Sequence, residues 1–76
     1  MDGEVIRAYL QREPFVPFRI EKTGGVWFEV KNPAMMVVTR RTVELGLPIE
    51  NGGQRFVTIA LVHVVSVEIV LPTVGS

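Results

Sequence analysis

The chain contains no cysteine and a single histidine, His63, among its 76 residues. Disulfide bonds are therefore excluded, and a closed zinc site, which takes four nitrogen, sulfur or oxygen ligands, is not expected. A domain of this length buries only about 60% of the surface that its unfolded chain exposes. The fold must therefore be stabilised by apolar packing, either within one chain or against another chain.

Neither sign of charge is in excess, because eight Lys and Arg residues balance eight Asp and Glu residues. A neutral domain lacks the overall attraction to phosphate that provides most of the affinity of nucleic-acid-binding proteins. The longest apolar stretch, residues 55–70, is shorter than the ~20 residues of a membrane span and contains Glu68. The N-terminal segment carries Asp2 and has no long apolar core, unlike a secretory signal. We therefore expect a cytoplasmic protein that does not bind a membrane.

Apolar residues, by contrast, are abundant: they make up 47% of the chain, and the mean hydropathy is positive. Residues 55–70 contain two sets of apolar residues with alternating spacing, Val57, Ile59 and Leu61, then Val65, Val67 and Ile69. This period of two predicts two strands. A small sheet cannot cover so much apolar surface on one face, so we expect a homo-oligomer. A well-filled monomeric barrel is the alternative.

A short helix is predicted over residues 2–12. Asp2 is suited to cap its N-terminus, and apolar residues form a stripe along one side, Val5, Ile6, Tyr9 and Leu10. Pro14 ends the helix because it disfavours the helical conformation of the preceding residue. So short a helix is not stable alone in water and must pack on the sheet.

Residues 14–18 form an extended connector, because Pro14 and Pro17 cannot lie in a central strand. We expect Phe15 and Phe18 to hold the helix over one end of the sheet. The spacing of the two prolines also fits a PxxP ligand of an SH3-type partner, but such ligands usually lie in disordered, polar segments.

A hairpin is predicted over residues 18–31, with a three-residue loop at residues 23–25. This register places Ile20 opposite Phe28 on the core face and Arg19 opposite Glu29 on the other face. Trp27 then lies on the outer face. There it is either a residue that contacts a partner or a side chain packed over the helix or a neighbouring aliphatic stem.

Further strands are predicted at residues 35–39 and 43–47, before a glycine loop at residues 49–54 and the two apolar strands. A one-turn connection near His63 is expected between those two strands. Residues 71–76 show no pattern and are expected to fray. The chain is therefore predicted to be a single domain, residues 1–76. It is mainly β, with an N-terminal helix and a five- or six-stranded, strongly bent antiparallel sheet over residues 18–70 that forms a small SH3-like barrel.

Two resemblances agree with this plan. The segment PFVPFRI at residues 14–20, followed by a glycine turn and Asn32-Pro33, resembles a group of small uncharacterised bacterial proteins with a PFxPFxI pattern. The order of elements, and the LVH segment at residues 61–63, are similar to the Sm-like family and its Tyr-Lys-His motif. Of the binding residues of that motif only His63 matches. The resemblance implies a small barrel whose last two strands pair between subunits of a ring that binds RNA.

Candidate sites for chemistry are few. His63 could act as a general base, but no nucleophile with an orienting group is near it in sequence, and Ser66 lacks an elbow-like glycine motif. The alternative is a histidine at a strand end that bonds a backbone carbonyl. Arg40, Arg41 and Arg55 could bind phosphate together, or could be solvated and paired with Glu44 or Glu50.

We therefore predict a non-enzymatic interaction module without a cofactor, a metal ion or a small-molecule substrate. It is expected to self-associate through its C-terminal strands. The predicted interface residues are Trp27, Phe56, Thr58 and Ala60, together with exposed backbone edges. The alternative is an Sm-like ring that binds single-stranded RNA through His63, Arg40, Arg41 and Arg55.

Overall fold

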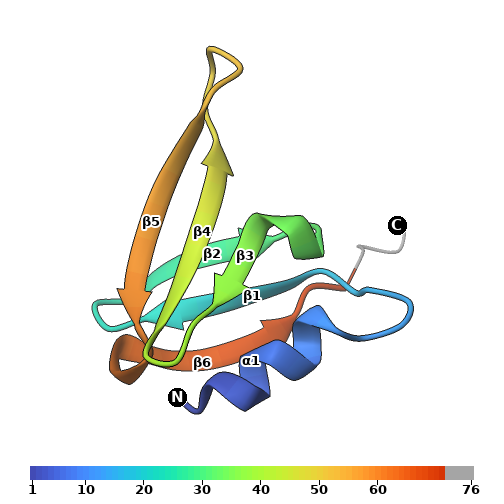
Figure 1. Cartoon of the computed structure of the whole chain (residues 1–76), viewed down its shortest axis with the longest axis vertical. Helices are drawn as coiled ribbons and strands as arrows, with labels where there is room; N and C mark the ends of the chain where they lie inside the picture. The colour runs from blue at the N-terminus through green and yellow to red at the C-terminus, as the bar shows by residue number, and fades with distance from the viewer. Residues whose placement is uncertain (72–76) are drawn as a thin grey trace.

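The computed structural model describes residues 1–71 and is mainly β, as the sequence predicted (Figure 1). It contains one α-helix and two short 3-10 helices: α1 (Gly3–Leu10), η1 (Pro33–Met35) and η2 (Leu61–His63). Its strands are β1 (Phe18–Lys22), β2 (Val26–Val30), β3 (Met36–Val38), β4 (Thr42–Pro48), β5 (Gln54–Ala60) and β6 (Val64–Ile69). Of the tail predicted to fray, residues 72–76 lie outside the described residues, and Leu71 is exposed.

The strands form two three-stranded antiparallel sheets, ordered β2-β1-β6 and β3-β4-β5. Their strands run in clearly different directions, and the β4–β5 hairpin extends well beyond the other elements (Figure 1). Each sheet ends in strands that have no further partner among residues 1–71. For the β3-β4-β5 sheet, one of these is the seven-residue strand β5.

The strands expected to bend into one barrel are divided between these two sheets, which do not close on each other within the described chain. Two short helices cause the division. The η1 turn begins after Asn32, whose side chain accepts a hydrogen bond from the Ala34 amide, and Pro33 has no amide to give to a ladder. The η2 turn separates β5 from β6 at the place where the sequence predicted a one-turn connection near His63.

The β1–β2 hairpin has the predicted register, with Ile20 opposite Phe28 and Arg19 opposite Glu29. Its loop contains Gly24 and Gly25 at φ values of 100° and 81°. Glycine adopts this left-handed region without a steric penalty, which explains why the loop can be this short.

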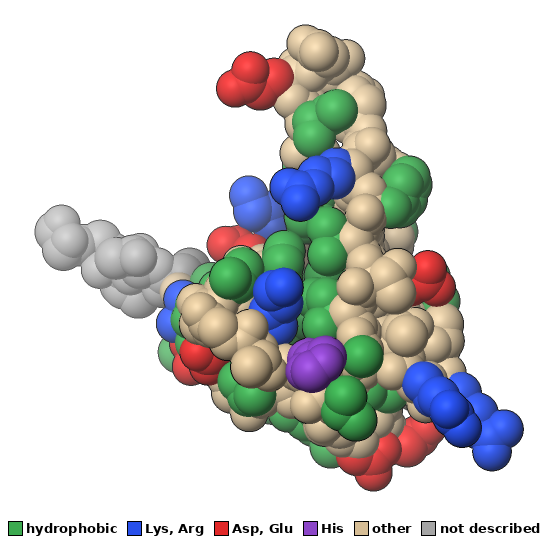
Figure 2. Space-filling view, turned by 90° about the vertical axis from the view of Figure 1, so that its left-hand side faces the viewer, with side chains coloured by type: hydrophobic (Ala, Val, Ile, Leu, Met, Phe, Trp, Pro, Cys, Tyr) green, Lys and Arg blue, Asp and Glu red, His purple; other side chains and the backbone are tan. Residues whose placement is uncertain are grey.

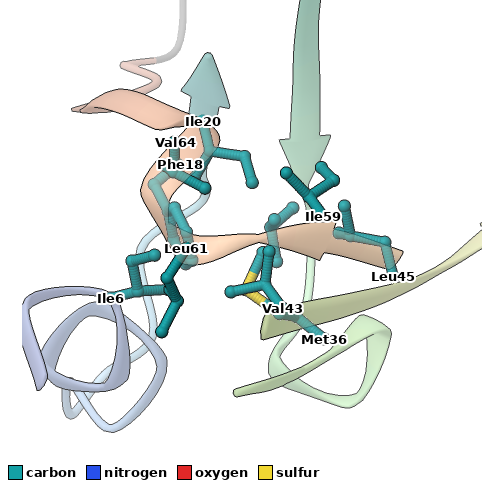
Figure 3. Packing of buried hydrophobic residues seen from close by; sticks show 10 residues of the cluster. Ile6, Phe18, Ile20, Met36, Val43, Leu45, Ile59, Leu61 and Val64 are labelled. Atoms are coloured by element: carbon teal, nitrogen blue, oxygen red, sulfur yellow. The ribbon is translucent and has the colours of Figure 1, made fainter. Parts of the chain in front are cut away.

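The core lies between the two sheets and under α1 (Figure 3). Its ten buried side chains are all apolar and come from the helix, both sheets and η2: Ile6, Phe18, Ile20, Val30, Met36, Val43, Leu45, Ile59, Leu61 and Val64. Asp2 caps α1 by accepting a hydrogen bond from the Glu4 amide at 2.9 Å, as its position predicted. The rings of Tyr9 and Phe15 pack against Phe18, with centroids 5.3 and 6.0 Å away, so the connector does hold the helix on the sheet.

None of the helices in the described part of the chain is both long and apolar enough to cross a membrane.

Candidate functional site

The predicted interface residues Phe56, Thr58 and Ala60 lie on one face of β5, the face turned away from the core. Their neighbours on the other face, Val57 and Ile59, point to the core. Phe56 is 75% exposed, although it is among the largest apolar side chains of the protein. An exposed aromatic on a strand with a free edge is typical of a surface that another chain covers.

A groove crosses the outer face of the β3-β4-β5 sheet beside Phe56. It has a volume of about 530 Å³, and we call it the outer groove. It is lined by residues of η1 and all three strands: Asn32, Ala34, Met35, Val37, Glu44, Gly46, Gln54 and Phe56. Gly46 lies opposite Phe56, and a β-carbon on Gly46 would come within 3.3 Å of the ring. The missing side chain at Gly46 thus lets Phe56 lie across the neighbouring strand.

Among the described residues, Glu44 carries the only charge in the outer groove. The Thr58 hydroxyl donates to its carboxylate at 3.4 Å, and no Lys or Arg within residues 1–71 forms an ion pair with it. Val37, which is 61% exposed, lies opposite Glu44 on β3. The outer groove therefore combines exposed apolar walls with one uncompensated negative charge.

The arginines proposed to bind phosphate lie in two places. Arg40 and Arg41 form the turn between β3 and β4 and line a hollow with Asp2, Ala60 and Val62. Val62 is 80% exposed. We call Arg40, Arg41 and Val62 the basic patch. Arg55 lies near the beginning of β5, at the end of the strand away from Arg40 and Arg41. The structure therefore does not bring the three arginines together. None of the three forms an ion pair with Glu44, Glu50 or any other carboxylate of the described chain.

His63 lies in a third hollow, the edge groove, beside the edge of β5 that has no partner strand among residues 1–71. This groove has a volume of about 330 Å³ and is lined by residues 57–60 together with Lys22, Thr23 and His63. Figure 2 shows this side of the molecule, where the histidine and several Lys and Arg side chains border a strip of hydrophobic side chains. The hydrogen bonds at His63 are made by its carbonyl, which accepts from the Thr23 amide at 2.8 Å.

Trp27 lies on the outer face of the other sheet, as predicted, and is 37% exposed. The guanidinium of Arg19 lies over its ring, 4.1 Å from the centroid. Arg19 also donates to the Glu68 carboxylate from Nε at 2.6 Å. Trp27 is thus part of a row of side chains across three strands, in which Arg19 packs on its ring.

Within residues 1–71 no group of three or more His, Cys, Asp or Glu side chains is placed to hold a metal ion. Ser66, the nearest hydroxyl to His63 in the sequence, donates to the Glu21 carboxylate at 2.9 Å. Its proton is therefore directed to a carboxylate on the outer face of the sheet and not to His63.

The sequence did not predict the outer groove, and it did not predict that Lys22 lines the edge groove. Gly46 was the available signal, since a glycine inside a strand often marks a place where another group approaches the backbone. Glu44 was considered only as an ion-pair partner for the arginines. Its position in the groove depends on η1, which lies above the sheet and was not predicted.

Comparisons with known proteins give no family for this chain: no family model, no curated protein and no solved structure matches it.

Proposed function

We propose that this protein is a non-enzymatic interaction module that self-associates through its C-terminal strands. The observation that carries this proposal is the seven-residue edge of β5, unpaired among the described residues and flanked by the exposed Phe56. Unpaired strand edges attract further strands, and proteins that stay monomeric usually protect them with charges, prolines or bulges. β5 has only Arg55 in that role.

The finer fold that fits this function is an open barrel of the Sm-like or SH3-like kind. The order of elements supports it: a helix, a hairpin, two middle strands, then two strands joined by a 3-10 turn, with β6 returning to pair with β1. In such an open form the gap beside β5 admits a strand from another subunit. The partner's strand would provide the hydrogen bonds that β5 lacks.

Light scattering after gel filtration tests the proposal. The wild-type chain is expected to elute as an oligomer at micromolar concentration. Thr58→Lys places a charge on the exposed face of the β5 edge and is expected to shift the protein toward the monomer. Gln11→Lys adds the same charge at the exposed end of α1 and serves as the control. A strictly monomeric wild-type chain would refute the proposal. So would a Thr58→Lys variant whose oligomeric state equals that of the wild type.

A second candidate function is binding of single-stranded RNA by an Sm-like ring. One observation favours it: Lys22 and His63 line the edge groove, and no carboxylate of the described residues lines it with them. Arg40 and Arg41 in the basic patch are also free of ion pairs within residues 1–71. Local clusters of cations can bind phosphate even when the net charge is zero.

A labelled single-stranded oligonucleotide tests this second function. If RNA binds, its affinity falls steeply with salt, and Arg40→Ala with Arg41→Ala weakens it further because two phosphate contacts are lost. Arg12→Ala with Lys31→Ala is the matched control, since it removes the same charge from two exposed side chains outside the basic patch. Absence of binding at low salt, or equal binding by both double variants, would remove this candidate.

A further inference from the structure

We infer that the partner of β5 is the β5 strand of a second copy, paired antiparallel about Thr58 so that a two-fold axis passes between the two Thr58 residues. This inference rests on the proposed self-association and specifies its geometry. The two β3-β4-β5 sheets would then join into one continuous sheet. Such an interface is isologous, because each copy presents the same strand to the other.

The sequence of β5 is complementary to itself about Thr58. In this register Phe56 lies opposite Ala60 of the partner, so a large outer side chain meets a small one. On the inner face Val57 lies opposite Ile59 of the partner, which continues the apolar surface of the core. Pairs of β-branched residues and the Thr58–Thr58 pair are favourable across strands.

Neighbouring registers are less favourable. A shift that centres the pairing on Val57 places the charged Arg55 opposite Ile59, which is only 4% exposed. Registers that place an inner residue opposite an outer one would turn Val57 and Ile59 of one copy away from the core of the other. Parallel pairing would set the two Arg55 side chains next to each other. Pairing about Thr58 keeps each Arg55 beyond the end of the partner's strand.

Charge complementarity supports the same arrangement. The outer groove, in which Glu44 is the one charge among the described residues, includes Gln54 and Phe56 from the beginning of β5. The basic patch adjoins Ala60 at the end of β5, and the Arg41 carbonyl there accepts a hydrogen bond from the Leu61 amide at 2.8 Å. Antiparallel pairing brings the beginning of one β5 beside the end of the other. The Gln54 end of each outer groove therefore faces the partner's basic patch, while Glu44, which lies opposite Thr58, stays one strand back from the two-fold axis.

The edge groove provides the room that this pairing needs. It lies along residues 57–60, the part of β5 that the register uses, and is bordered by Lys22, Thr23 and His63. None of the backbone–backbone hydrogen bonds between loops in the described chain involves the amides of residues 56–60. The outward backbone groups of β5 are thus available to a second strand.

Oxidative cross-linking tests the register directly, because the chain has no cysteine of its own. Thr58→Cys is expected to form a disulfide-linked dimer under mild oxidation, since residues directly opposite in an antiparallel pair have Cα atoms about 4.5–5.5 Å apart, within the range that a disulfide spans. Val62→Cys, which is also exposed but lies outside β5, is the control for random collision. A mixture of Phe56→Cys and Ala60→Cys chains is expected to cross-link between the two variants more than within either.

The outcomes separate the register from the self-association itself. A dimer in light scattering that cross-links at Val57→Cys, or at no position of β5, would overturn the register and leave self-association intact. A wild-type chain that does not associate would overturn both. Cross-linking at Thr58→Cys with the Phe56 and Ala60 pairing is the result expected.

A charge exchange provides a second measurement that does not depend on cysteines. Glu44→Arg is expected to weaken dimerisation by less than about tenfold, and chiefly at low salt, because it turns a long-range attraction to the partner's basic patch into a repulsion. Adding Arg40→Glu and Arg41→Glu to it is expected to restore the affinity. Glu50→Arg, at the hairpin tip, makes the same change in net charge and is the control. Equal dissociation constants for Glu44→Arg and Glu50→Arg, or no restoration in the exchanged variant, would contradict the arrangement.

Discussion

Arg19 shows how single side chains connect this small fold. It lies opposite Glu29 on one side and Glu68 on the other, and it pairs with Glu68 while its guanidinium covers Trp27. The sequence predicted the pairing with Glu29 across the hairpin, because that register depends on residues that are close in the chain. It did not predict Glu68, since the neighbour on the other side of β1 is decided by the packing of β6.

Ile6 is the residue through which the helix is held in the core. It is the only fully buried side chain of α1, whereas Val5 on the same helix is 44% exposed. We predict that Ile6→Ala lowers the free energy of unfolding by about 2–4 kcal/mol, because it leaves a cavity between the helix and the sheets. Urea unfolding followed by circular dichroism, at one protein concentration, measures this loss.

Val5→Ala is the control for that experiment. It shortens an apolar residue of the same helix at a partly exposed position, so a loss below ~1 kcal/mol is expected. Equal losses for the two variants would mean that α1 does not pack on the sheets through Ile6.

At the scale of elements, the β1–β2 hairpin is the most self-contained part of the fold. Its register and its loop followed from alternating residues and two adjacent glycines, and the structure has both. The division into two sheets could not be predicted in the same way. It depends on how the strands on either side of η1 and η2 pack against the rest of the chain, although the connection at η2 itself was predicted near His63.

Gly25 tests the importance of backbone conformation in that hairpin. Its φ is 81°, and a β-carbon added there would meet no atom within 4 Å apart from its chain neighbours, so Gly25→Ala changes the backbone preference and little else. We predict a loss of about 1–2 kcal/mol in the free energy of unfolding. Gly53→Ala is the control in the other hairpin, where φ is not positive and the nearest contact is an ordinary 3.4 Å, and it should be neutral or slightly stabilising. A neutral Gly25→Ala would contradict the loop geometry.

At the scale of the whole molecule, the chain leaves many large apolar side chains in contact with water. Phe56, Val37 and Val62 are the most exposed of those near β5. The sequence predicted this excess from composition alone, because 76 residues with 47% apolar content cannot cover themselves with one small core. It also identified Phe56, Thr58 and Ala60 as the outer face of the edge. It could not locate the outer groove, because the groove is formed by elements that are distant in sequence.

The excess of exposed apolar surface connects the exposure of Phe56 with the proposed association of two chains. A second copy at β5 would cover Phe56 and supply hydrogen bonds to a strand that, among the described residues, has a partner on only one side. The stability of such a protein depends on its concentration, because the oligomer and the folded chain are linked by mass action. The apparent unfolding temperature is therefore predicted to rise with protein concentration, which calorimetry at several concentrations measures.

Amide hydrogen exchange of β5 at low and high protein concentration tests the central claim most directly. If a second strand covers the edge, the β5 amides that do not bond β4 will exchange rapidly in dilute solution and become protected as the concentration rises. The core amides of β1 will remain protected throughout. Edge amides of β5 that exchange at the unprotected rate at every concentration would contradict the claim.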